Sequence, residues 1–133
     1  TLRSVAKGEP RRRLVQVTRA TDGEVAPCRT TTLPLLGAAP ADLLARVDAP
    51  TRLVRRYGTF APQVMELATA DPSLAEPVAP GCPTTGAEFA YAVAHEGALT
   101  VEDLIERRTR TSFVEADIAP ATAAAERALS LVG

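Results

Sequence analysis

Aromatic side chains are so scarce in this chain that they restrict the kind of core it can build. The 133 residues include three Phe, two Tyr and no Trp, although 46% of them are hydrophobic. The core must therefore consist largely of Leu, Val and Ala. These side chains suit closely packed helices better than sheets, which favour aromatic and β-branched residues. We expect a mainly α fold, a compact bundle of about five to six helices with an extended, proline-punctuated N-terminal segment.

The chain is long enough for one domain with a core of its own. Its net charge is −1, but residues 1–22 hold six basic groups against two acidic ones, so the remainder is mildly acidic. The basic head shows no helical period, and we expect residues 1–26 to be a poorly ordered lead-in to a helical domain at 27–133. A short apolar stretch at 14–17 could pair as a strand. No nucleic-acid partner is expected, because the excess positive charge is confined to this head.

Prolines divide the rest of the chain into segments. The stretch 27–40 is extended, and four prolines between Asp71 and Pro83 rule out a regular helix there. Apolar spacing and capping residues predict the helices between and after these stretches. They comprise 41–47, a helix capped by Thr51 and ended by Gly58, one capped by Thr59, one between Thr85 and Gly97, one from Thr100 to about Arg110, and one from about Ile118 into Leu131.

Most carboxylates near these helices have structural explanations. Thr85 and Glu88 have the spacing of a capping box, in which each side chain satisfies a backbone N–H at the helix start. Glu102 and Asp103 lie at the positive end of their helix. Glu96 lies late in its helix, where a negative charge is unfavourable, so we expect an ion pair with an arginine of the next helix. A catalytic acid is the minor alternative.

No pattern in the chain predicts a complete catalytic, cofactor-binding or metal site. The glycines are isolated, and neither GxGxxG nor GxxxxGK[ST] occurs, which argues against a self-contained FAD, NAD or nucleotide site. His95 is the only histidine and is more simply a surface or interhelical residue than a catalytic base. Metal ligation by Cys28, Cys82 and His95 would require three distant points to converge. A helix-turn-helix around Gly97 is disfavoured, because acidic residues begin the second helix.

Several motifs, in order, carry a resemblance to a known family. The segments are Arg29-Thr30, Leu33-Pro34-Leu35-Leu36-Gly37-Ala38, Arg56-Tyr57-Gly58, Ala87-Glu88-Phe89-Ala90-Tyr91-Ala92-Val93 with Glu96, Leu99-Thr100-Val101-Glu102-Asp103-Leu104 and Arg107-Arg108-Thr109-Arg110. Together they resemble the C-terminal domain of FAD-dependent glycerol-3-phosphate dehydrogenases and alpha-glycerophosphate oxidases. The resemblance runs from about Pro27 to Leu131, and its second half is the more specific part.

The resemblance implies a helical domain appended to a larger flavin domain. The parent enzyme would oxidise sn-glycerol 3-phosphate to dihydroxyacetone phosphate and pass electrons to quinone or oxygen. Its FAD, substrate-binding arginines and catalytic base would belong to the preceding domain, so this chain alone would be inactive and hold no cofactor. Arg107 and Arg108 could reach the flavin domain or anionic lipid, but helix-end charge and pairing with Glu96 or Glu106 explain them more simply.

The expected partner is the flavin domain of the same enzyme. The resemblance also admits a homodimer and a peripheral contact at the inner face of the cell membrane, with the protein otherwise cytoplasmic. The alternative from another functional class is a free-standing helical module that binds another protein and has no redox activity.

Overall fold

The computed structural model describes residues 28–132, so the expectations for the basic lead-in and its apolar stretch lie outside the described residues. The chain divides into two units, with the boundary after Pro34. In the described part of the first unit, the backbone N–H groups of Thr32 and Leu33 both donate to the Arg29 carbonyl. The second unit begins at Leu35 and contains all the helices named below.

The second unit confirms the mainly α prediction. Five α-helices lie within residues 35–132: α2 (Ala41–Leu44), α3 (Thr51–Tyr57), α4 (Ala61–Ala70), α5 (Gly86–His95) and α6 (Glu115–Val132). Three 3₁₀ turns and one π-helical segment join them: η1 (Gly58–Phe60), η2 (Pro72–Ala75), η3 (Asp103–Arg108) and η4 (Thr111–Phe113). The proline-rich connection forms no α-helix, as predicted, and makes only an isolated bridge between Pro77 and Thr85.

Two predicted helix starts are wrong. Thr51 is the first helical residue rather than a cap, because Pro50 occupies the N-cap position. Thr59 does not cap the next helix, because the 3₁₀ turn η1 takes up residues 58–60 and α4 begins at Ala61. Pro62 stands in the first turn of α4, where a fixed φ and a missing N–H are tolerated.

The core consists of two clusters that share α5. In the first, Phe89 and Ala92 of α5 pack with Leu104, Ile105 and a row of alanines on α6. In the second, Ala87 and Tyr91 of α5 pack with Leu53, Tyr57, Ala61 and Val64. Most of the buried apolar residues within 28–132 are alanines, as the scarcity of aromatics predicts. Small side chains let helices approach closely, which explains the packing of α6 against α5.

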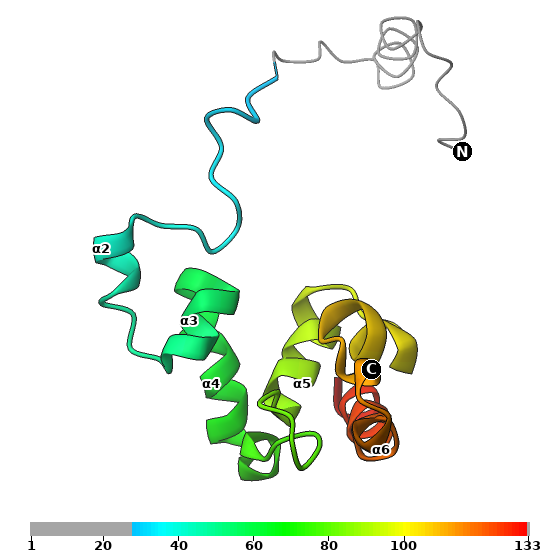
Figure 1. Cartoon of the computed structure of the whole chain (residues 1–133). Coiled ribbons are helices and arrows are strands. Elements are labelled where there is room, and N and C mark those ends of the chain that lie inside the picture. The colour runs from blue at the N-terminus through cyan, green and yellow to red at the C-terminus, as the bar shows by residue number, and fades with distance from the viewer. Residues whose placement is uncertain (1–27, 133) are drawn as a thin grey trace, which may run out of the picture. The chain divides into compact units, whose positions relative to one another are not determined.

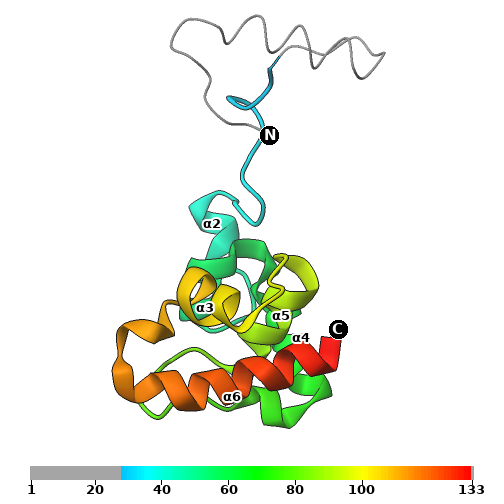
Figure 2. The same ribbon diagram turned by 90° about the vertical axis from the view of Figure 1, so that its right-hand side faces the viewer.

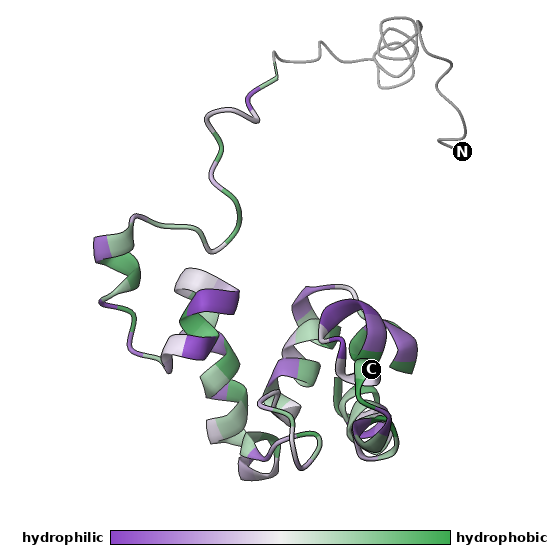
Figure 3. Cartoon of the chain, viewed as in Figure 1, coloured by the Kyte–Doolittle hydropathy of each residue, from purple (hydrophilic) through white to green (hydrophobic). Residues whose placement is uncertain are grey.

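The pictures show how these helices lie. α4 and α5 run side by side in Figure 1, and α6 packs along the other side of α5. Figure 2 shows α6 along its whole length as the last element of the bundle. α4 is mostly hydrophobic and η3 mostly hydrophilic along the ribbon (Figure 3). Within residues 28–132, no helix combines the length and the apolar character needed to cross a bilayer.

Glycines close two of the helices, as predicted. Gly58 (φ 59°) ends α3, and Gly97 (φ 67°) follows the end of α5. Gly58 also allows a close backbone approach, because a Cβ built on it would lie 1.8 Å from the carbonyl oxygen of Gly37. The Gly37 carbonyl in turn accepts a 2.9 Å hydrogen bond from the Thr59 N–H. The segment preceding α2 is thereby held against the end of α3.

Candidate functional site

The most strongly connected polar group among the described residues is Glu88. Its side chain is 0% exposed and accepts hydrogen bonds from both terminal nitrogens of Arg52, at 3.0 and 2.6 Å. The Thr85 backbone N–H donates to the same carboxylate at 2.9 Å, which confirms the capping box. The Tyr57 hydroxyl lies 3.4 Å away. A carboxylate with no exposure to water is stable only because these donors replace its hydration.

Sequence reasoning missed the arginine partners of Glu88. Arg52 and Arg56 are four residues apart on α3, so they lie on one face of that helix. Arg56 Nε lies 3.7 Å from the Glu88 carboxylate, and hydrogen bonding to Glu88 raises the pKa of Arg52. The i, i+4 arginine spacing was a visible signal, but nothing local identified a residue 36 positions away as the acceptor.

A second set of arginine contacts joins three elements through backbone carbonyls. Arg56 donates to the carbonyl of Arg108 at 2.6 Å, and Arg108 donates to the carbonyl of Glu96 at 2.6 Å. These bonds satisfy acceptors at the ends of η3 and α5, which have no partner within their own helices. The two arginines therefore connect α3, η3 and the end of α5.

The predicted partners of Arg107 and Arg108 need correction. Arg108 contacts the backbone of Glu96 rather than its carboxylate, because a guanidinium can satisfy the acceptor that the helix end leaves free. Arg107 pairs with Asp103, four residues earlier, rather than with Glu96 or Glu106. These contacts favour the structural interpretation of Arg107 and Arg108 over a contact with the flavin domain or with lipid.

Asp103 anchors the start of its helical segment. Its carboxylate accepts from the backbone N–H groups of Leu99 and Thr100 at 3.0 and 3.1 Å, while the Thr100 hydroxyl accepts from the Asp103 N–H at 3.2 Å. The hydrogen bond from Leu99 and the Arg107 guanidinium lower the pKa of Asp103 to about 2. The carboxylate is therefore ionised at neutral pH and serves as a helix cap, not as a proton donor.

The segment that Asp103 begins was predicted as an ordinary helix, but it is π-helical. The Thr109 N–H donates to the carbonyl five residues earlier, that of Leu104, at 3.1 Å. The Thr109 hydroxyl donates to the same oxygen, and the Thr111 hydroxyl to the Ile105 carbonyl. π-Turns often occur at functional sites, but here the polar groups around the turn bond to each other and to the backbone.

His95 lies beside a surface hollow instead of a catalytic partner. The hollow has a volume of about 310 Å³ and is lined by Leu36, Arg56, Tyr57, Phe60, Gln63, Tyr91, His95 and Glu96. The ring of Tyr91 lies 5.3 Å from that of Tyr57 and 4.7 Å from that of His95, measured between centroids. Burial raises the pKa of Tyr57 well above its usual range, so its hydroxyl stays protonated.

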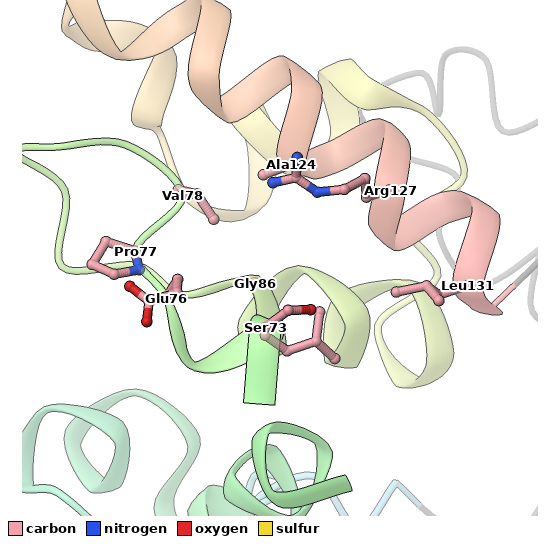
Figure 4. Close-up of a pocket in the computed structure, with 9 residues that line it drawn as sticks. Ser73, Glu76, Pro77, Val78, Gly86, Ala124, Arg127 and Leu131 are labelled. Carbon is pink, nitrogen blue, oxygen red and sulfur yellow. The ribbon is translucent and has the colours of Figure 1, made fainter. Parts of the chain in front are cut away.

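Two other hollows open on the second unit. One, of about 550 Å³, is formed by α2 and α3 and lined mainly by small apolar residues. The other, of about 290 Å³, lies between η2 and α6 and is shown in Figure 4. There Arg127 and Leu131 of α6 lie across from Ser73 and Glu76. Neither hollow contains a pair of groups arranged for proton transfer or nucleophilic attack.

The described residues do not fit a flavin or a metal ion. Glycines with positive φ occur at 37, 58 and 97, where each serves a single turn, so they do not form the consecutive N–H cradle that a dinucleotide needs. Within 28–132 there is no group of three His, Cys, Asp or Glu residues close enough to hold a metal ion. Cys28 and Cys82 are free thiols.

The charged side chains that the structure brings together thus bind the helices to one another. A unit of this kind is a small helical domain held together by buried polar contacts such as those of Glu88, with hollows and exposed apolar residues at its surface. The comparisons with known proteins specify the family. The chain belongs to the family described as the C-terminal domain of alpha-glycerophosphate oxidase, which matches residues 28–133.

Curated relatives bear related names. Glycerol-3-phosphate dehydrogenase 1 of Mycobacterium tuberculosis is 45% identical over 111 residues, which cover 79% of this chain and 21% of that protein. Glycerol-3-phosphate dehydrogenase 2 of the same organism is 43% identical over 61 residues, covering 46% of this chain and 10% of the relative. The chain therefore spans about a fifth of the length of glycerol-3-phosphate dehydrogenase 1. No solved structure matches it.

Proposed function

We propose that this chain is the accessory helical C-terminal domain of an FAD-dependent glycerol-3-phosphate dehydrogenase. The parent enzyme oxidises sn-glycerol 3-phosphate to dihydroxyacetone phosphate, and the chain supports or docks against the flavin domain without contributing a complete active site. The observation that carries this proposal is the family match over 28–133, together with relatives named glycerol-3-phosphate dehydrogenase.

The contacts of the described residues support the accessory role. Arg52 and Arg56 are bound to Glu88, Arg108 to the backbone of Glu96, and Arg107 to Asp103. A substrate phosphate would have to compete with these internal acceptors for each guanidinium. The arginines are therefore better suited to holding the helices in place than to binding glycerol 3-phosphate.

A domain replacement tests the proposal. The matching C-terminal part of Mycobacterium tuberculosis glycerol-3-phosphate dehydrogenase 1 is replaced by residues 28–133 of this chain, and the chimera is compared with the relative truncated before that part. We expect the chimera to retain FAD and to oxidise glycerol 3-phosphate, and the truncated protein to lose stability, flavin or activity. Equal behaviour of chimera and truncated protein would contradict the accessory role.

The purified 133-residue chain provides the second comparison. Incubated with FAD and passed through a desalting column, it is expected to remain colourless and to show no oxidation of glycerol 3-phosphate. Stoichiometric retention of yellow flavin together with activity would overturn the proposal, because the chain would then contain the site that we assign to the preceding domain.

A further inference from the structure

Two adjacent leucines are exposed on a stretch of backbone that is held in place. Leu35 and Leu36 are 83% and 92% exposed. The next residue, Gly37, accepts a hydrogen bond from Thr59, and a Cβ at Gly37 would lie 2.4 Å from the Tyr57 carbonyl oxygen. The leucines therefore do not belong to a loose tail. They are presented to solvent at a defined position on the second unit.

The hollow beside Leu36 is built like the centre of a protein interface. Its floor includes the rings of Tyr57 and Tyr91, both at least nine-tenths buried, and the half-buried ring of Phe60. Arg56, Gln63 and Glu96 provide polar groups at its edge. An apolar centre with a polar rim, rich in Tyr and Arg, is the usual composition of a docking surface.

The occupant is indicated by the part of the relatives that this chain does not match. About four-fifths of Mycobacterium tuberculosis glycerol-3-phosphate dehydrogenase 1 lies outside the match, and the family is described as a C-terminal domain. In such a polypeptide the preceding domain joins this one through the segment just before Leu35. Leu35 and Leu36 are the first two residues of the second unit, so they lie at the end of this unit through which the chain enters from the preceding domain.

We propose that Leu35, Leu36 and the hollow lined by Phe60, Tyr91 and His95 form the surface on which the preceding flavin domain docks. This inference rests on the proposed function, and it adds which face is used and what chemistry the partner presents: an apolar segment that covers the leucine pair and enters the hollow. Gln63 and Glu96 at the rim fix the orientation of that segment through polar contacts.

Cysteine labelling in the chimera tests the docking surface. Leu36→Cys and, as a matched control, Leu99→Cys are introduced into the chimera and into the 133-residue chain, and maleimide labelling is followed by peptide mass spectrometry. Leu99 is 80% exposed and does not line the hollow. We expect Leu36→Cys to react about tenfold more slowly in the chimera than in the separate chain. In the chimera the two domains must separate locally before maleimide can reach the thiol. Leu99→Cys should react equally fast in both.

The other outcomes of the labelling experiment distinguish failure of the docking surface from failure of the proposed function. If the chimera retains flavin and activity but Leu36→Cys reacts as fast as in the separate chain, the docking surface is wrong and the proposed function stands. If Leu36→Cys is already protected in the separate chain, and more so at higher protein concentration, a second copy covers this face and the inference is overturned. If the chimera behaves like the truncated relative, the proposed function fails and the docking surface fails with it.

A second variant does not depend on labelling. Leu36→Gln should lower the thermal unfolding midpoint of the chimera while leaving that of the 133-residue chain unchanged, because the side chain is exposed there. Leu99→Gln should leave both midpoints unchanged. Equal effects of Leu36→Gln on the chimera and on the separate chain would show a role inside the helical unit and contradict docking.

Discussion

Glu88 carries more of the internal bonding than any other residue described. Its carboxylate is removed from water and holds two arginines of α3 against the start of α5. The same residue completes the capping box of α5, so a local motif and a long-range ion pair depend on one side chain. The ion pair between the half-exposed Arg52 and the buried Glu88 orients α3 relative to α5.

Glu88→Gln should therefore destabilise the chain considerably. The amide has the same shape but cannot balance two guanidinium groups. Loss of one partner of a buried ion pair typically costs roughly 3–5 kcal/mol. The Arg52 side chain is 37% exposed and can regain hydration, so we expect a loss of about 2 kcal/mol in the free energy of unfolding, measured by urea denaturation. Glu66→Gln, at an exposed position on α4, is the matched control and should change the free energy of unfolding little. Comparable losses in both variants would refute the special role of Glu88.

At the scale of single elements, the Asp103 side chain caps the start of η3. This cap makes the free energy of unfolding depend on pH in the acid range. The pKa of Asp103 is lowered to about 2 by its hydrogen bonds from Leu99 and Arg107. Because the folded pKa lies below the unfolded value, the stabilisation is fully present above about pH 4 and is lost as pH falls through about 2.

Asp103→Asn should thus lower the unfolding midpoint at pH 6 and have much less effect near pH 2, where about half of the wild-type carboxyl groups are already protonated in the folded protein. Circular dichroism melts of both proteins across this pH range measure the difference. A gap between the two proteins that stays constant down to pH 2 would show that the ionised carboxylate is not what stabilises the helix start. An NMR titration of the Asp103 carboxyl checks the pKa directly.

The junction between the Leu35–Gly37 segment and α3 depends on a glycine. Gly58 has φ 59° and ψ −128°, and a Cβ there would lie 1.8 Å from the Gly37 oxygen. Gly58→Ala should cost on the order of 3 kcal/mol of stability, from backbone strain and the displaced segment. Gly81→Ala is the control, since nothing lies within 4 Å of its added Cβ. If urea denaturation finds both substitutions equally mild, the close approach of the two backbones is wrong.

At the scale of the whole molecule, α5 contributes residues to both core clusters, so we expect the two clusters to unfold together. Phe89 belongs to the cluster with η3 and α6, whereas Tyr57 and Tyr91 belong to the cluster with α3 and α4. The chain has two Tyr and no Trp, so tyrosine fluorescence reports on the second cluster only. Circular dichroism reports on helices from both.

Phe89→Leu should reveal the coupling. The substitution leaves a small cavity in the first cluster and is expected to cost about 1 kcal/mol. If α5 couples the clusters, the urea midpoint must fall equally by tyrosine fluorescence and by circular dichroism. A shift seen by circular dichroism alone would mean that the two clusters unfold independently.

The sequence by itself determined the features that depend on neighbouring residues. The shortage of aromatic residues specified a helical core of Leu, Val and Ala, prolines placed the connection at 71–83, and Gly58 and Gly97 marked two helix ends. The capping box of Thr85 and Glu88 was readable because its bonded groups are within three residues of each other, and Asp103 was placed correctly at the start of its helix, although its cap bonds to Leu99 and Thr100 were not predicted. The motif order also identified the family, which the match over 28–133 bears out.

The tertiary structure decided which distant groups meet. The pairing of Arg52 with Glu88 joins residues 36 positions apart, and the contacts of Arg56 and Arg108 with backbone carbonyls depend on where α3, η3 and α5 pack. The end of the π-helical segment η3 is fixed by one such contact, because the Arg108 carbonyl accepts from Arg56 of α3, 52 positions away. A hollow beside Leu36 exists only because α3, α4 and α5 surround it. These features rest on long-range packing and desolvation, which no spacing of residues along the chain encodes.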